Sequence, residues 1–138
     1  MINVNGNVTK NFSISEMANN ESSAEVKLVL TPEVIEHAQM MQELRDWYGK
    51  PLHVSSWYRE SAYNKSVGGA SNSCHLDARA TDINNIPAKL YAAFTEKWKE
   101  ICKKHNKIGG VCYYNWGMHF DSHSDKFGCK FFRTHDYR

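Results

Sequence analysis

Two stretches far apart in the chain carry the same kinds of polar side chain. Residues 73–82 read Ser-Cys-His-Leu-Asp-Ala-Arg-Ala-Thr-Asp, and residues 116–123 read Trp-Gly-Met-His-Phe-Asp-Ser-His. Alternate side chains of a strand share one face, so Asp82 is expected to share a face with two small alanines, and His75 to lie on the loop that enters this strand. With His119 from the second stretch, they make three protein ligands. Three such ligands and an open position for water are the pattern of a catalytic zinc site.

The rest of the chain predicts helices and strands in runs, which is typical of an α+β fold with an antiparallel sheet. A capping box at 13–16 predicts a short helix. Thr31, Pro32 and Glu33 predict the start of a long helix that Gly49 ends. A short helix is expected at 60–67, and a second long helix opens at Pro87. Strands are expected at 52–57, 78–83, 109–114, 118–123 and 128–133. Residues 1–10 are expected to be loose or to form an edge segment, and residues 19–23 to form a loop.

Length and composition limit the possible functions. A chain of 138 residues is expected to form one domain, residues 1–138, with its own core. The net charge of +2 favours neither a nucleic-acid partner nor a membrane surface. The start of the chain lacks the pattern of a signal peptide, and no apolar run is long enough to span a bilayer. A cytoplasmic origin is therefore expected, with four free thiols at Cys74, Cys102, Cys112 and Cys129, and so is a monomer.

Residues 73–82 resemble the signature S-x-H-x-x-G-x-A-x-D of the zinc D-Ala-D-Ala carboxypeptidase and L-alanyl-D-glutamate endopeptidase family. Ser73, His75, Ala80 and Asp82 match, whereas Ala78 stands where the family has glycine. Four further segments resemble the family in order. The first, residues 11–17, is similar to a segment of phage and prophage members. The others are residues 54–59, residues 63–70, and the two last strands of the family, at 110–114 and 119–121.

The resemblance implies a compact fold of the hedgehog/DD-peptidase type, a Zn²⁺ cofactor and a peptidoglycan stem peptide as substrate. It implies His75, Asp82 and His119 as metal ligands, and Arg59 as the group that holds a substrate carboxylate, because a guanidinium makes a two-point contact with a carboxylate. Ser73 and Trp116 are further candidates for substrate contact, although Ser73 could instead support the loop around His75. A lytic enzyme without a signal peptide is expected to act on the wall after release, or from a phage particle.

The general base is the point at which this chain departs from the pattern. Relatives commonly have Asp or Glu three residues before the last histidine ligand, and Trp116 occupies that position. In an extended strand His119, Asp121 and His123 are expected to share one face. Asp121 and His123 are therefore the nearest substitutes for a group that takes and returns a proton. Asp121 has a second reading of equal weight, as the partner that orients a metal-bound histidine.

Two alternatives therefore stay open beside the zinc peptidase. One is a peptidoglycan-binding module on the same fold, weakly active or inactive. The other is a structural phage protein without zinc. Other site chemistry is less favoured, because the chain contains neither H-E-x-x-H nor a P-loop, and it lacks the deaminase pattern.

Overall fold

The protein is described from a computed structural model, which covers residues 6–18 and 28–138. The element order is α1 (Ile14–Met17), α3 (Pro32–Tyr48), β1 (Val54–Ser56), α4 (Ser61–Ser66), β2 (Ala80–Ile83), α5 (Tyr91–Lys104), β3 (Gly110–Tyr114), β4 (Gly117–Asp121) and β5 (Arg133–Asp136). Three short 3₁₀ helices join them: η1 (Cys74–Asp77), η2 (Ala88–Leu90) and η3 (Ser124–Phe127). The predicted α+β class is confirmed, and the loop predicted at 19–23 falls outside the described residues.

The helices begin and end where their capping residues predict. The hydroxyl of Ser13 accepts from the backbone N–H of Glu16, whose carboxylate accepts from the N–H of Ser13 in return. The hydroxyl of Thr31 accepts from the backbone N–H of Val34 at the start of α3, and Gly49 ends this helix in the left-handed conformation at φ 75°. The helix predicted from Pro87 is divided, because the turn η2 precedes α5.

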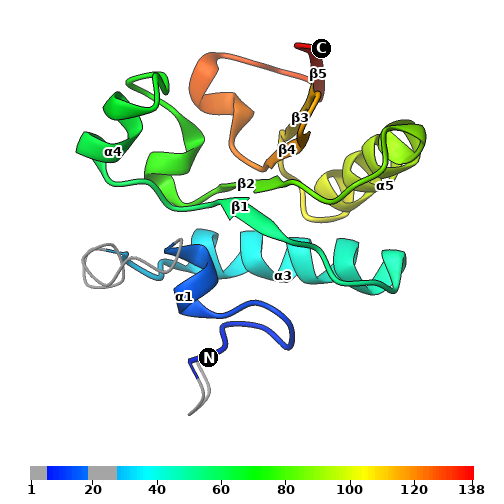
Figure 1. Ribbon diagram of the computed structural model, residues 1–138, viewed down its shortest axis with the longest axis horizontal. Helices are drawn as coiled ribbons and strands as arrows, with labels where there is room; N and C mark the ends of the chain where they lie inside the picture. Colours follow the sequence, from blue (N-terminus) through cyan, green and yellow to red (C-terminus); the bar gives the residue numbers. More distant parts are fainter. Residues whose placement is uncertain (1–5, 19–27) are drawn as a thin grey trace.

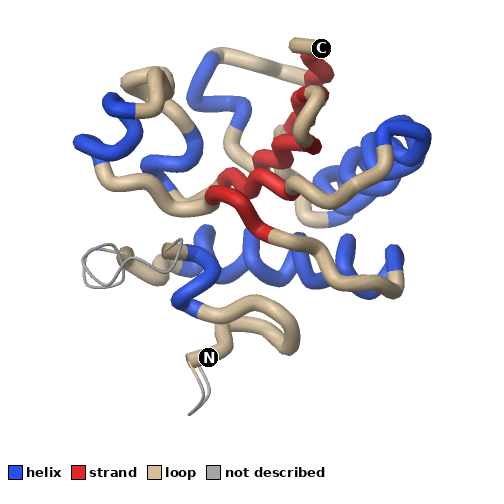
Figure 2. The backbone as a smooth tube through the Cα atoms, in the orientation of Figure 1, coloured by secondary structure: helices blue, strands red, loops and turns tan. Residues whose placement is uncertain are grey.

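Five strands form one sheet in the order β1-β2-β4-β3-β5, and the strands cross the middle of the molecule (Figure 2). The first three pairings are antiparallel, as predicted, but β5 runs parallel to β3, so the sheet is mixed. The strand predicted at 128–133 is wrong, since the edge strand starts only at Arg133. Phe131, which lies within the predicted strand, is 83% exposed and packs into no core.

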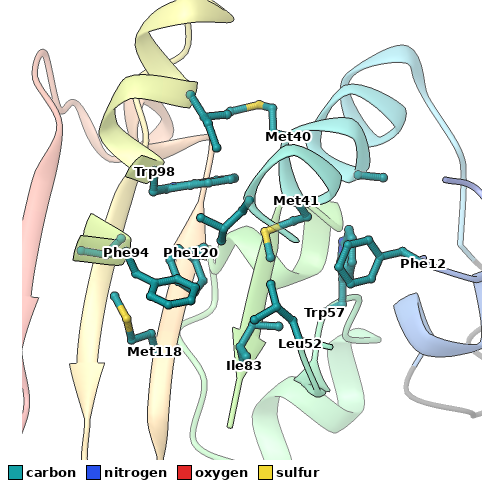
Figure 3. Close-up of a cluster of buried hydrophobic side chains, with 14 of the residues drawn as sticks. Phe12, Met40, Met41, Leu52, Trp57, Ile83, Phe94, Trp98, Met118 and Phe120 are labelled. Carbon is teal, nitrogen blue, oxygen red and sulfur yellow. The ribbon is translucent and has the colours of Figure 1, made fainter. Parts of the chain in front are cut away.

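The hydrophobic core lies on one face of this sheet, under α3 and α5. Figure 1 shows α3 running along the sheet and α5 at its side. Side chains of both helices meet the strands there, as Figure 3 shows for Met41 of α3, Trp98 of α5 and Phe120 of β4. Because successive strand residues point to opposite faces, the neighbours of Phe120, His119 and Asp121, project from the other face. The core thus fixes the position of the strands that carry the candidate ligands.

Two groups of polar contacts hold the long helices in place, one between α3 and the sheet region and one between α3 and α5. His37 of α3 is fully buried and bonds Ser122 Oγ at 2.7 Å and Thr81 Oγ1 at 3.0 Å. Burial lowers the pKa of His37 to about 3, so it stays neutral. Between α3 and α5 lies an interhelical ion cluster made of Glu36, Glu43, Lys104, His105 and Lys107. Within the described part of the chain, no helix is long and apolar enough to cross a membrane.

Candidate metal centre

His75 is held by the segment that follows β1. Its ring Nδ1 lies 2.7 Å from the carbonyl oxygen of Trp57, and its own carbonyl accepts from the backbone N–H of Arg59 at 3.0 Å. The buried indole of Trp57 donates to the carbonyl of Ala78 at 2.9 Å. These bonds fix both ends of η1. Because Nδ1 faces an acceptor, the proton of a neutral ring sits there, and the lone pair of Nε2 is available to a metal.

Asp82 and His119 are directly paired residues of the adjacent strands β2 and β4. Asp82 Oδ1 lies 2.9 Å from His119 Nδ1 and 3.2 Å from His75 Nε2. The three candidate ligand atoms all lie within 4.8 Å of one another. Bonds of about 2.0–2.2 Å to zinc from two nitrogens and one oxygen bring ligand atoms to comparable separations. This donor set therefore fits zinc without rearrangement of the backbone.

Asp121 lies behind His119, away from the cluster. Its carboxylate is fully buried and has four neighbours: His119 Nε2 at 3.1 Å, Arg133 at 3.0 Å, Ser124 Oγ at 2.6 Å and the backbone N–H of His123 at 3.4 Å. A metal-bound histidine needs such an acceptor on its second nitrogen. The contacts favour the orienting role for Asp121, since its carboxylate is occupied and shielded from the pocket.

The charges of the cluster stabilise one another. Burial alone would lower the pKa of His119, but its hydrogen bonds to Asp121 and Asp82 raise it to about 10. Burial opposes the ionised form of Asp82, yet the charge of His75 and the bond to His119 hold its pKa well below the usual range. In the metal-free chain the protonated ring of His119 thus bridges two carboxylates, because Nδ1–H donates to Asp82 and Nε2–H donates to Asp121. A metal ion held by His119 would take the place of the Nδ1 proton.

Arg59, the residue expected to hold a substrate carboxylate, lies beside this cluster. Its guanidinium is tied to Ser56 Oγ at 3.0 Å, Asn64 Oδ1 at 3.3 Å and Asp82 Oδ2 at 3.4 Å. Asn64 in turn donates to the carbonyl of Ala70 at 2.7 Å. Gly69 makes this possible, because a Cβ at this position would lie 2.0 Å from Asn64 Oδ1. Arg59 is therefore a fixed cation rather than a mobile surface arginine.

A pocket of about 380 Å³ opens over the cluster, large enough for a small ligand. An adjoining pocket of about 270 Å³ shares Arg59, Val67, Asp82 and Trp116 with it, so the two form one groove. Among the described residues lining this groove, Asp82 is the single acid. A larger hollow of about 460 Å³ lies on the far side of η1, but it contains none of the three candidate ligands.

The other predicted site residues differ in how close they lie to the three candidate ligands. Trp116 lines both pockets and is 45% exposed, with its ring stacked on Tyr114 at 4.7 Å. Ser73 lines the pocket too, but its hydroxyl accepts from the backbone N–H of His75 and so supports the loop. His123 is not brought into the cluster. It bonds Asp125 at 3.0 Å and belongs to the hollow beyond η1, because β4 ends at Asp121.

Two contributors were missed from the sequence. Asn64, which orients Arg59, gives no signal beyond its place before Gly68 and Gly69. Arg133 lines the pocket and bonds Asp121, but it lies in β5, a strand whose position the sequence did not reveal.

The comparisons with known proteins agree with the geometry. A family model described as peptidase M15 matches residues 10–121, which is most of the chain and includes all three candidate ligands. No curated protein matches the chain.

Proposed function

Because the chain belongs to the peptidase M15 family, a family of zinc-dependent metallopeptidases, we propose that it hydrolyses the stem peptide of bacterial peptidoglycan. The observation that carries this proposal is the convergence of His75, Asp82 and His119 at the floor of a groove, beside a fixed arginine. Two bonds suit the groove: a terminal D-Ala-D-Ala bond or the bond between L-Ala and D-Glu. A phage or prophage origin, with action on the wall after release, belongs to the same proposal.

Each residue of the groove has a distinct task in this reaction. His75, Asp82 and His119 hold zinc, which when bound supplies a Lewis acid that polarises the peptide carbonyl and activates a water molecule. Asp121 accepts a hydrogen bond from His119 and keeps its ring oriented. Arg59 binds a carboxylate of the peptide, so the scissile bond lies over the ligands. Trp116 forms an apolar wall, and Ser73 holds the loop of His75.

Tyr114 is a further donor at the groove. It lies on the same face as Cys112, which pairs with His119 across the strands. Burial, together with the charges of Cys112 and Asp82, raises the pKa of its hydroxyl to about 12. At neutral pH this phenol keeps its proton, and it can donate a hydrogen bond to the oxygen on which negative charge develops.

A second function is favoured by one specific observation, namely the absence of a free carboxylate base. The described residues that line the groove include no acid other than the candidate ligand Asp82. A protein with this groove and no base would bind stem peptides without cutting them. The two functions share the metal site and differ in the product.

The test measures metal and product together. We expect about one zinc per chain in untagged protein, lost in His75→Ala and retained in the control His53→Ala, which changes an exposed histidine outside the cluster. Wild-type protein incubated with purified stem peptides should release a new amine end by mass spectrometry, and a chelator should stop the release. Zinc with peptide binding but no product would select the binding function, and absence of zinc would refute both.

A further inference from the structure

Arg133 is the second fixed cation of the pocket. Its Nε donates to Ser124 Oγ at 2.9 Å, and its Nη2 donates to Asp121 Oδ2 at 3.0 Å. Its side chain keeps 21% exposure while lining the pocket. Arg59 has the same design, with bonds to Ser56, Asn64 and Asp82 and 16% exposure. Each guanidinium is thus positioned by neutral and acidic partners while part of it remains open to a ligand.

The two arginines come from opposite ends of the sheet. Arg59 follows β1, which is one edge strand, and Arg133 begins β5, the other edge strand. The ligand strands β2 and β4 lie between them. A peptide whose scissile bond lies over His119 and Asp82 therefore meets one arginine on each side of that bond. Strand β5 also lies beyond residues 10–121, the part that the family model matches.

A row of aromatic rings follows the groove. Trp116 stacks on Tyr114 at 4.7 Å and 15°, and Tyr114 stacks on Tyr137 at 5.2 Å and 19°. All three residues line the pocket. Since the rings are nearly parallel, the row spans about 10 Å, the length of about three extended residues. The aromatic wall is therefore about as long as a short peptide segment bound in the pocket.

The charge balance of the pocket favours an anionic peptide. Arg59 and Arg133 are offset by Asp82 and Asp121, to which they are bonded. Two neutral histidine ligands add no charge, so the charge of a bound divalent ion is left uncompensated. A substrate that brings two carboxylates would compensate it, and bidentate contact with guanidinium is the strongest way to hold each of them.

We propose that Arg133 forms a second carboxylate subsite, across the metal ligands from Arg59, and that the substrate carries a free carboxylate on each side of the cleaved bond. The proposal rests on the proposed peptidase function and deepens it. A stem peptide that ends in D-Ala-D-Ala has its C-terminal carboxylate for Arg59. On the other side of the bond, the residue before the two alanines supplies a free carboxylate when it is a diaminopimelyl residue and none when it is a lysyl residue, and we assign this carboxylate to Arg133.

The test compares two stem pentapeptides that differ in one group, a diaminopimelyl residue with its second carboxyl free or converted to the carboxamide. Wild-type protein should cleave the acid with kcat/KM about 10- to 100-fold above the amide, since hydrogen bonds to charged groups are the strong ones. In Arg133→Gln the two rates should become equal. The ratio should persist in the control Arg138→Gln, because Arg138 is exposed and pairs with Asp136 outside the pocket.

The ratio separates recognition from a structural role. If Arg133 only supported Asp121, Arg133→Gln would lower both rates and leave their ratio unchanged, and the subsite would be refuted. Equal rates in wild-type protein would refute it as well. If neither peptide is cut, the proposed function fails, but calorimetric titration of zinc-loaded protein still measures the subsite. Tighter binding of the acid, abolished in Arg133→Gln, would support it, and equal binding would refute it.

Discussion

Asp121 decides between two mechanisms, and Asp121→Asn tests them. The substitution keeps the shape of the side chain but removes its charge. In the native chain one carboxylate oxygen, Oδ2, accepts from both His119 and Arg133, while Oδ1 accepts from Ser124. An amide group in either orientation places an NH₂ donor against at least one of these donors. Because Asp121 is fully buried, water cannot replace the lost acceptor.

The expected magnitudes follow from these contacts. Leaving Arg133 without its buried partner should lower the free energy of unfolding by about 3–5 kcal/mol. We expect the lower end of this range, because the side chain of Arg133 is 21% exposed. Loss of the acceptor behind His119 should weaken zinc binding about 10- to 100-fold, which is about 1.4–2.7 kcal/mol. Activity should fall in parallel with zinc occupancy and recover when zinc is in excess.

Zinc affinity is measured by competition with a chromophoric chelator, and stability by urea unfolding. The matched control is Asp125→Asn, which changes an exposed carboxylate that bonds His123, and it should alter neither quantity. The opposite pattern would refute our reasoning: unchanged zinc affinity, with activity lost even at saturating zinc. That result would make Asp121 the general base despite its burial.

Three further predictions concern the surroundings of the site. Gly69→Ala should push Asn64 aside, since the new Cβ would lie 2.0 Å from its side-chain oxygen, and should raise the KM for peptides with a C-terminal carboxylate while zinc content stays the same by elemental analysis. Ala78→Gly should change the free energy of unfolding by less than about 1 kcal/mol, because relief of a left-handed alanine is offset by the loss of a buried methyl and by the greater freedom of glycine in the unfolded chain. In the interhelical ion cluster, burial opposes the charge of His105, but its bonds to two glutamates raise its pKa above 6.5, and the pKa values of those glutamates are lowered below 4.5. Unfolding curves of His105→Gln should therefore show the largest loss of stability between pH 4.5 and 6.5. The loss should become smaller at higher pH, because native His105 loses its proton there. A loss of stability that does not depend on pH would contradict this assignment.

The sequence predicts those parts of the fold whose signals are local. Thr31 and Gly49 bound α3 within the chain itself, through a hydroxyl cap and a left-handed glycine. The period of two in the strands correctly predicts that His119 and Asp121 share a face, and the pairing of Asp82 with His119 brings the ligands together. These features depend on neighbours in sequence or on one strand register.

The features that could not be predicted depend on contacts between distant segments. His123 was placed on the face of His119 by assuming that β4 continues, but the strand ends at Asp121 and the chain turns at His123, with φ −140° and ψ 36°, into η3. Arg133 reaches the pocket only because β5 returns parallel to β3 after this turn. A parallel pairing needs a long connection, and no local pattern marks where such a strand begins.

Ala78 shows how a departure from the family pattern can be read once the backbone is known. It stands where the signature has glycine, and it ends η1 at φ 57° and ψ 27°, a left-handed conformation that glycine adopts without strain. A glycine in the signature suits this turn between His75 and Asp82, because the turn needs a left-handed residue. The left-handed conformation costs alanine about 1–2 kcal/mol. Burial of its methyl group in the core, where Ala78 is 1% exposed, offsets part of this cost. The indole of Trp57 bonds the carbonyl of the same residue, so the turn is held by the core as well as by its own backbone. The turn that joins His75 to Asp82 is therefore compatible with alanine, and Trp116 remains the departure that concerns the proposed general base.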